Sequence, residues 1–372
     1  MRLEKELKKL MTKEGLLLAG FPNYPRIFAR DSLIASWQLL NFDSSIAKRT
    51  LEFLSNHQGK KIDNDKEEEP GKILHETDLK AKEHPDGYFP FPYYGSVDST
   101  PLFLILFYFY FKKTKDKKFV EKHLEDIISA INWMVNYGDK DSDLFLEYER
   151  KNPHGLFHQG WKDGFENHLK ITPPVAIVEV QGYQYLALMQ WQKVLKNLGF
   201  SKMAESLKER AEKLKRKFNK SFWMEDKKYY ALGLDKEKKQ RKAITSNPGH
   251  LLFCGICDKT KERLVVKKLF SEELFTPYGI RTHSSKEPDF DPLSYHLGSI
   301  WPHDNWIIAQ GLKKLGYKNE YKKIKSALLL AYEKLGYIPE LYGVVKNNLV
   351  EIPTSCYPQA WATGALINFL NE

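Results

Sequence analysis

The chain has 372 residues, of which 42% are hydrophobic and 28% are charged, and its formal net charge is +10. This composition is typical of a globular protein and excludes an intrinsically disordered chain. Aromatic residues reach 13%, and many stand beside Gly, Pro, Asp and His, which fits a sugar-binding cleft or, equally well, a large aromatic core.

The excess positive charge does not indicate a nucleic-acid partner. Most Lys residues fall in helix-like stretches such as 202–220 and 313–325, where apolar residues and some Glu lie between them. That pattern is typical of solvated helix faces, and no nucleic-acid-binding motif accompanies it. The same content of Lys and Glu hints at a thermophilic source.

Neither a membrane nor a metal partner is indicated. The N-terminus is charged and leads into no secretory segment, and the longest apolar run, 101–111, is too short to cross a bilayer. Cys254 and Cys257 form a C-x-x-C without the second pair that a zinc site needs, and Cys356 stands alone. We therefore expect buried free thiols and a cytoplasmic enzyme without a metal or other cofactor.

Apolar residues recur with helical periodicity along the whole chain. Strand-like segments are few and short (145–149, 228–232 and 348–352), and no alternation of strands and helices predicts a parallel sheet. The periodicity predicts helices over 2–13, 31–41, 44–57, 99–112, 118–137, 175–197, 200–219, 246–254, 259–269, 294–314, 318–334 and 356–370.

The connections alternate between short polar turns and long segments rich in Gly, Pro, Trp, Tyr, His and Asp. Long loops of this kind in a compact domain are usually functional. Helical hairpins with short turns at one end and long loops at the other gather the unusual residues on one face. We therefore predict an all-α protein, a single (α/α)6 toroid over residues 1–372. Its long loops are 15–30, 59–98, 138–174, 270–293 and 335–355.

The first polar motif is Arg30-Asp31-Ser32. The fork of Arg30 and the two acceptor oxygens of Asp31 suit two neighbouring sugar hydroxyls. Asp31 or Ser32 fits a helix N-cap as well. The second motif, 93–101, raises the same choice, because Asp98 is either a sugar ligand or a cap.

The third motif is Gly160-Trp161-Lys162-Asp163-Gly164. A carboxyl group beside an indole ring, with Gly allowing close approach, can be desolvated until it keeps its proton near neutral pH. Asp163 is therefore a candidate general acid, and a solvated turn residue is the alternative. Lys162 opposes an elevated pKa of Asp163 if its ammonium group points inward.

The fourth motif, 295–305, contains His296, Trp301, His303 and Asp304. The two His residues stand seven positions apart, which is too far for chelation on one straight helix. Sugar contacts are therefore favoured over a metal.

The fifth motif, Pro339-Glu340-Leu341, places a lone carboxylate in an apolar segment. A buried Glu without a partner is unfavourable, so Glu340 indicates either an ion pair, for example with Arg281 or a Lys, or a base that holds water.

In this order the motifs resemble the glucosidase domain of glycogen debranching enzymes, the amylo-α-1,6-glucosidase family. The Arg-Asp-Ser block also resembles glucoamylases, which share the toroid. The resemblance extends from about residue 15 to the end and rests on Arg30-Asp31-Ser32, Tyr94 to Asp98, Gly160 to Asp163, Glu179 to Tyr183, Ser299 to Asn305, Pro339-Glu340 and Ser355 to Trp361.

The resemblance implies an (α/α)6 barrel and hydrolysis with inversion, with Asp163 as general acid and Glu340 as general base. Inversion requires carboxyl groups roughly 6.5–9.5 Å apart, and we expect the acid to occupy the drier site. The carbohydrate ligands that the motifs and the resemblance indicate are Arg30, Asp31, Tyr94, Asp98, Trp161, Lys162, Glu179, Gln181, His296, Trp301, His303, Asp304 and Trp361.

The chain departs from the family by lacking its amylase-like transferase domain and the β-rich N-terminal domain of many relatives. We expect terminal glucose to be released from α-1,6 branches of glycogen-derived oligosaccharides. The first alternative is a hydrolase of a small compatible-solute glycoside, glucosylglycerate or mannosylglycerate. Extra Arg or Lys residues in the pocket, which would bind the glycerate carboxylate, would favour this alternative. A non-hydrolytic sugar-binding toroid and an epimerase using His296 and His303 remain as further alternatives.

Overall fold

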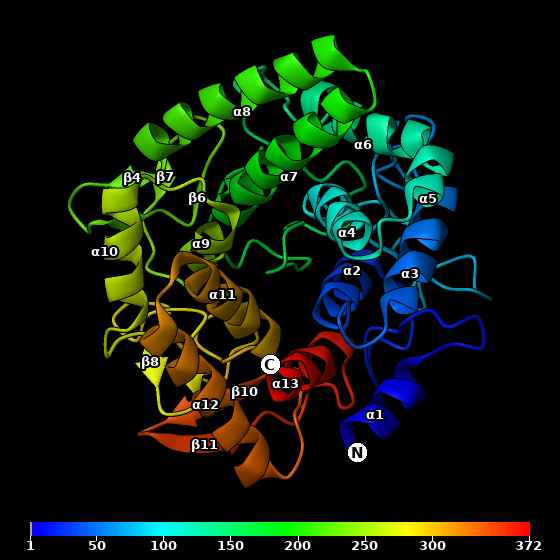
Figure 1. Ribbon diagram of the computed structural model, residues 1–372. Coiled ribbons are helices and arrows are strands. Elements are labelled where there is room, and N and C mark those ends of the chain that lie inside the picture. The colour runs from blue at the N-terminus through cyan, green and yellow to red at the C-terminus, as the bar shows by residue number, and fades with distance from the viewer. Residues whose placement is uncertain (1) are drawn as a thin grey trace.

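The computed structural model describes residues 2–372, which form two concentric layers of helices (Figure 1). In the inner layer each helix packs against the next, and the last closes the ring on the first. This architecture confirms the predicted all-α (α/α)6 toroid. The inner helices are α2 (Ala29–Gln38), α4 (Ser99–Thr114), α7 (Val178–Asn197), α9 (His250–Cys254), α11 (Pro302–Leu315) and α13 (Ala360–Asn371). The outer helices are α1 (Arg2–Leu10), α3 (Ser44–Asn56), α5 (Lys117–Lys122), α6 (Leu124–Asn136), α8 (Ser201–Ser221), α10 (Lys259–Leu269) and α12 (Lys318–Leu335).

The two layers differ in sequence because they differ in burial. Inner helices are buried over most of their surface, and in α2 every residue except Trp37 is buried. Outer helices bury one stripe and expose Lys-rich faces, which accounts for much of the positive charge. In α8 the stripe follows spacings of three and four residues and consists of Ala204, Leu207, Ala211, Leu214 and Phe218.

The predicted helix over 294–314 is wrong in its first half. Helix α11 begins only at Pro302, because proline lacks the N–H that a helix interior needs and is favoured in the first turn. Gly298 has a φ of +156°, a backbone conformation that side chains rarely adopt. The segment 295–301 is therefore a loop, and His296 does not share a helix with His303.

Three further boundaries differ from the periodicity. The predicted helix 118–137 is interrupted at His123 between α5 and α6. The predicted helix 356–370 begins at Ala360, where Gln359 accepts a cap hydrogen bond from the backbone N–H of Ala362. The predicted strand 145–149 contributes only a single bridge from Tyr148 to Val175.

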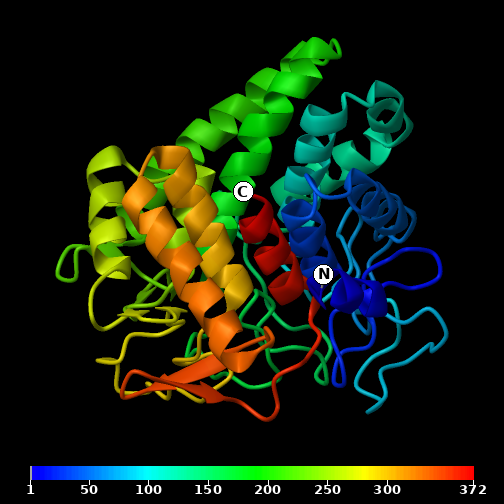
Figure 2. The same ribbon diagram turned by 60° about the horizontal axis from the view of Figure 1, so that its bottom comes forward.

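Short antiparallel ladders brace the long loops. Figure 2 shows these loops and strands gathered on one side of the ring, as the spacing of the motifs predicts. In one ladder Phe28 lies opposite Glu76, which joins the first two long loops. The strands are β1 (Ile27–Phe28), β2 (Glu76–Thr77), β3 (Ala176–Ile177), β4 (Trp223–Met224), β5 (Tyr229–Tyr230), β6 (Gly233–Leu234), β7 (Gln240–Arg241), β8 (Phe275–Thr276), β9 (Gly279–Ile280), β10 (Tyr342–Val345) and β11 (Asn348–Glu351). A 3-10 turn, η1 (Asn247–Gly249), leads into α9.

The structure also describes the cysteine side chains and the apolar character of the helices. Cys254, Cys257 and Cys356 are buried and unpaired, as predicted. In the described part of the chain, none of the helices combines the length and apolar composition that a bilayer crossing requires.

Candidate active site

A cavity of about 230 Å³ lies where the long loops meet the first turns of α2 and α13. Its lining residues come from segments that are far apart in sequence, and both proposed catalytic carboxyl groups belong to them. The sequence-predicted site residues that line it are Arg30, Asp31, Trp161, Asp163, Trp301, Glu340 and Trp361.

Asp163 lies at one side of the cavity with its side chain 25% exposed. Arg30 donates from Nη1 to Oδ2 of Asp163 across 2.8 Å, and Oδ1 has no hydrogen-bond partner among the described residues. Burial raises the pKa of Asp163, while the charge and hydrogen bond of Arg30 act in the opposite direction. The net shift is upward, which favours a protonated carboxyl group.

Arg30 is held by a second, fully buried carboxylate. Its Nε donates to Oδ2 of Asp98 across 2.6 Å, and Ser96 donates its hydroxyl to the other oxygen of Asp98 across 2.7 Å. The guanidinium charge is therefore shared between Asp98 and Asp163. With burial, the charge of Asp98 opposes the effect of Arg30 and helps to raise the pKa of Asp163.

Glu340 follows Pro339 in the last long loop and is 2% exposed. Tyr295 donates its hydroxyl to Oε1 across 2.7 Å, and the backbone N–H of Cys356 donates to Oε2 across 3.1 Å. Burial raises the pKa of Glu340 to about 7, although both hydrogen bonds lower it. No basic side chain pairs with Glu340 among the described residues, so of the two interpretations the base that holds water is favoured over the ion pair.

The expectation that the acid occupies the drier site is wrong. Glu340 is the more buried carboxyl group and Asp163 the more exposed one. The reason is that Glu340 obtains two donors from the protein itself, whereas one oxygen of Asp163 is left open to the cavity.

Three indole rings form an aromatic side of the cavity. Trp161 and Trp301 lie 5.8 Å apart at 70°, and Trp301 and Trp361 lie 5.9 Å apart at 79°. Edge-to-face packing of this kind fixes the rings. Apolar ring faces then suit the C–H faces of a sugar.

Eight sequence-predicted ligands do not line the cavity, and their direct contact with sugar stays a prediction. Three of them, Asp98, His296 and His303, contact residues that do line it. They are Tyr94, Asp98, Lys162, Glu179, Gln181, His296, His303 and Asp304.

Two of these residues hold loops in place. Gln181 bonds both backbone groups of Leu146, at 2.9 and 2.8 Å. Tyr94 donates its hydroxyl to the backbone carbonyl of His57 across 2.8 Å.

The two His residues lie behind the indole rings. His303 stacks on Trp361 with ring centres 3.7 Å apart, and His296 stacks on Trp301 at 5.4 Å. His296 also forms a hydrogen bond of 3.1 Å with the backbone carbonyl of Asp163. Both imidazoles therefore position cavity residues.

Lys162 points away from its neighbour Asp163. Its ammonium group is buried and donates to the backbone carbonyl of Thr282 across 2.7 Å, and burial lowers its pKa to about 8. Deeper in the ring, Asp304 forms a hydrogen bond of 2.8 Å with His250. Glu179 is buried, and burial raises its pKa.

Sequence reasoning missed one wall of the cavity, formed by Tyr24, Arg26, His75, Glu76 and His84. These residues lack a compact motif because two separate loops supply them. The pairing of β1 with β2 brings Arg26 and Glu76 together, and Arg26 Nε donates to Glu76 across 2.9 Å.

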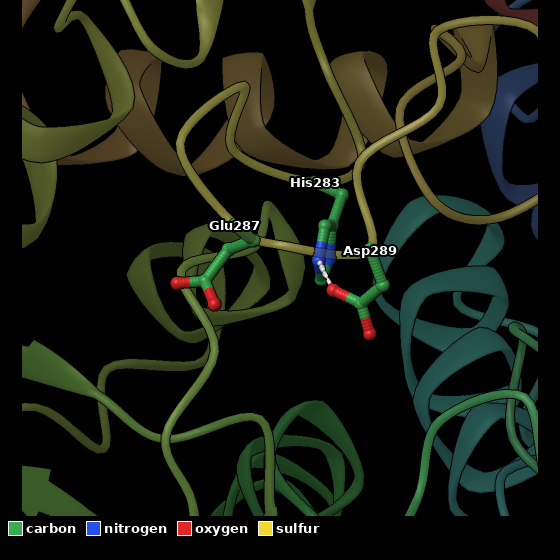
Figure 3. A group of neighbouring side chains, drawn as sticks. All are labelled: His283, Glu287 and Asp289. Carbon is green, nitrogen blue, oxygen red and sulfur yellow. Dashed lines mark hydrogen bonds and ion pairs between the residues drawn. The ribbon is translucent and has the colours of Figure 1, made fainter.

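Two acidic clusters outside the cavity have the composition of a metal site. His283, Glu287 and Asp289 approach one another in Figure 3, and Asp139, Asp141 and Asp143 form the other cluster. Basic side chains already neutralise both. Asp289 pairs with Lys170 and Arg241 at 3.0 Å each, and Lys238 pairs with Asp141 at 2.8 Å. We assign no metal to either cluster.

The chain is similar to known proteins in sequence and in structure. The family model described as amylo-alpha-1,6-glucosidase matches residues 89–368. A mannosylglycerate hydrolase of Selaginella moellendorffii is 28% identical over 89 residues, which is 22% of this chain and 18% of that protein. The match thus spans less than a fifth of that relative.

Solved structures share the fold. The GH63 mannosylglycerate hydrolase from Thermus thermophilus in complex with Tris superposes with a TM-score of 0.78 at 14% identity. The alignment covers 100% of this chain and 99% of that one. A complex of that hydrolase with glucose superposes with a TM-score of 0.76, also at 14% identity.

Proposed function

Since the chain belongs to the amylo-alpha-1,6-glucosidase family of glycoside hydrolases, we propose that it removes the terminal sugar from a small α-glycoside with inversion. The observation that carries this proposal is that Asp163 and Glu340 line the same cavity. An acid and a base on two sides of a sugar are what inverting hydrolysis requires.

In the proposed reaction Asp163 donates its proton to the glycosidic oxygen as the bond from that oxygen to the anomeric carbon breaks. Glu340 accepts a proton from a water molecule, whose oxygen attacks the anomeric carbon from the opposite face. Tyr295 and the N–H of Cys356 orient Glu340. Each oxygen of Glu340 keeps a lone pair for that water.

Binding of the terminal sugar is assigned to Asp31 and to the indole rings of Trp161, Trp301 and Trp361. Arg30 is occupied by Asp98 and Asp163, so its role is to position the acid. Gln359 donates to Oδ2 of Asp31 across 2.8 Å, and Oδ1 has no hydrogen-bond partner within residues 2–372. This oxygen is the one proposed to accept a sugar hydroxyl.

The size of the cavity supports a small substrate. Its volume of about 230 Å³ lies below the roughly 300–1,000 Å³ of common ligand pockets. The relatives named as mannosylglycerate hydrolases favour the same choice. The second candidate, release of glucose from α-1,6 branches of short glycogen-derived oligosaccharides, is favoured by the family model.

Residues 1–372 are assigned to one catalytic domain, because α13 packs on α2 and closes the ring. Hydrolysis is favoured over sugar epimerisation, because neither His296 nor His303 lines the cavity. The partner is a carbohydrate, and the pair of carboxyl groups favours hydrolysis over binding alone.

The test is a screen for released sugar with glucosylglycerate, mannosylglycerate, isomaltose, maltose, trehalose and limit dextrin. We expect release from the glycerate glycosides above all, and preference for isomaltose or limit dextrin would select the second candidate. Proton NMR of the first product should show the β-anomer. An initial α-anomer would contradict inversion, and no release from any substrate would contradict hydrolysis.

A further inference from the structure

Arg26 is a buried cavity residue with unused hydrogen-bond donors. Its side chain is 8% exposed and lines the cavity. Only its Nε has a hydrogen-bond partner among the described residues, Oε2 of Glu76 at 2.9 Å. A guanidinium group carries five N–H donors in a fixed fork, so both terminal nitrogens of Arg26 are left to a ligand.

Arg30, the other arginine that lines the cavity, has more hydrogen-bond partners than Arg26. Arg30 donates to Asp98, to Asp163 and to the carbonyl of Gln159, at 2.6, 2.8 and 3.4 Å. All three of its nitrogens are engaged. Of the two arginines that line the cavity, only Arg26 has terminal nitrogens without a hydrogen-bond partner among the described residues.

Two aromatic rings hold the Arg26 guanidinium in place. Its carbon lies 5.5 Å from the ring centre of Phe28 and 5.9 Å from that of Phe91. A fork fixed in this way loses little conformational freedom when it binds a planar anion.

Glu76, the counter-ion of Arg26, balances the positive charge of Arg26 only in part. Burial raises the pKa of Glu76 to about 7, although Arg26 lowers it. Near neutral pH Glu76 is therefore partly protonated, and Arg26 retains positive charge for another anion.

Arg26 stands on the side of the acid. His75 lies between them, with Nε2 3.9 Å from Oδ2 of Asp163 and 3.9 Å from Oε1 of Glu76. Glu340 is bound instead by Tyr295 and the N–H of Cys356. In inverting hydrolysis the acid contacts the leaving-group oxygen and the base holds water on the opposite face.

We infer that Arg26 forms the leaving-group subsite and binds a carboxylate or phosphate carried by a small aglycone. The inference rests on the proposed function, because it names the substrate class of that same cavity. A bidentate contact of Arg26 with the anion would hold the glycosidic oxygen beside Asp163.

The first experiment needs no variant. It compares kcat/KM for glucosylglycerate with kcat/KM for glucosylglycerol, which has the same sugar and a neutral aglycone of similar size. We expect a preference of roughly 10- to 100-fold for the anionic substrate. Equal rates on both would overturn the inference and leave the proposed function standing, whereas no hydrolysis of either would count against the proposed function.

The second experiment changes the residue. Arg26→Gln should abolish the preference for the anionic substrate, and Arg26→Lys should restore part of it. Lys82→Gln is the matched control, because Lys82 is an exposed basic residue of the loop 59–98, which supplies Glu76, and does not line the cavity. A preference that survives in Arg26→Gln, or that falls equally in Lys82→Gln, would overturn the inference.

The third experiment measures binding without turnover. Isothermal titration calorimetry with D-glycerate, glycerol 3-phosphate and glycerol should show binding of one anion or both, and which one binds separates carboxylate from phosphate recognition. Glu76→Gln should tighten that binding, because it removes the competing carboxylate. Equal affinity for glycerol and both anions would overturn the inference.

Discussion

Arg30 donates a hydrogen bond to Asp163 across 2.8 Å, although Asp163 is the group that must carry a proton in the proposed reaction. A lone arginine at this distance would lower the pKa of the carboxyl group. Here Asp98 binds the same guanidinium at 2.6 Å and raises the pKa of Asp163 through its own charge. The arrangement orients the acid and still leaves its pKa raised.

Asp163→Asn should separate the acid role from all others. Without a proton donor, hydrolysis of natural glycosides should fall by about 10²- to 10⁴-fold. In glucosyl fluoride the fluoride ion leaves without protonation, so hydrolysis of this substrate should fall far less. Steady-state kinetics on both substrates gives the comparison, with Glu340→Gln as the control that loses both. An equal loss on both substrates in Asp163→Asn would remove Asp163 from the acid role.

Asp98→Asn should shift the pH profile without touching the cavity lining. Removing this charge leaves Arg30 to act on Asp163 alone, so the pKa of Asp163 falls. A general acid works only while protonated, and therefore the alkaline limb of kcat/KM should move to lower pH. Ser96→Ala is the matched control, because it removes one hydrogen bond to Asp98 and keeps the charge. An unmoved limb in Asp98→Asn would disprove the coupling.

The fold was predictable from sequence because its signals are local. Helical periodicity marks each helix, and the long polar-aromatic loops mark the functional face. The boundary error at 295–301 has a local cause too, since Gly298 and Pro302 override an apolar pattern that otherwise continues into α11.

The site was predictable only where the signal is a compact motif. Asp163 beside Trp161 and Glu340 after Pro339 stand out in sequence, and both line the cavity. Arg26 and Glu76 are separated by 50 positions, and no local sequence pattern predicts that β1 pairs with β2. His303 is a predicted ligand because of its polar and aromatic neighbours in sequence, whereas its stacking on Trp361 is a property of the packed ring and has no local signal.

Tyr295→Phe tests the environment of the proposed base. The hydroxyl of Tyr295 lowers the pKa of Glu340, so its loss should raise that pKa above about 7. A general base works only while ionised, and the acidic limb of kcat/KM should therefore move to higher pH. Tyr342→Phe is a suitable control, because Tyr342 donates to the backbone carbonyl of Tyr278 and does not line the cavity. A limb that stays in place, or moves to lower pH, would count against Glu340 as the base.

Glu340→Gln should make the protein inactive and more stable at alkaline pH. The pKa of Glu340 is raised from 4.5 to about 7 in the folded protein, so the folded state binds the proton more tightly than the unfolded state. The stability that this proton contributes is fully present below pH 4.5 and is lost as the pH rises through about 7. Glutamine imitates the protonated side chain at every pH, and its advantage should grow from near zero at pH 4 to about 3 kcal/mol at pH 8. Urea unfolding of both proteins at several pH values measures the difference in the free energy of unfolding. An advantage that does not depend on pH would show that burial does not hold a proton on Glu340.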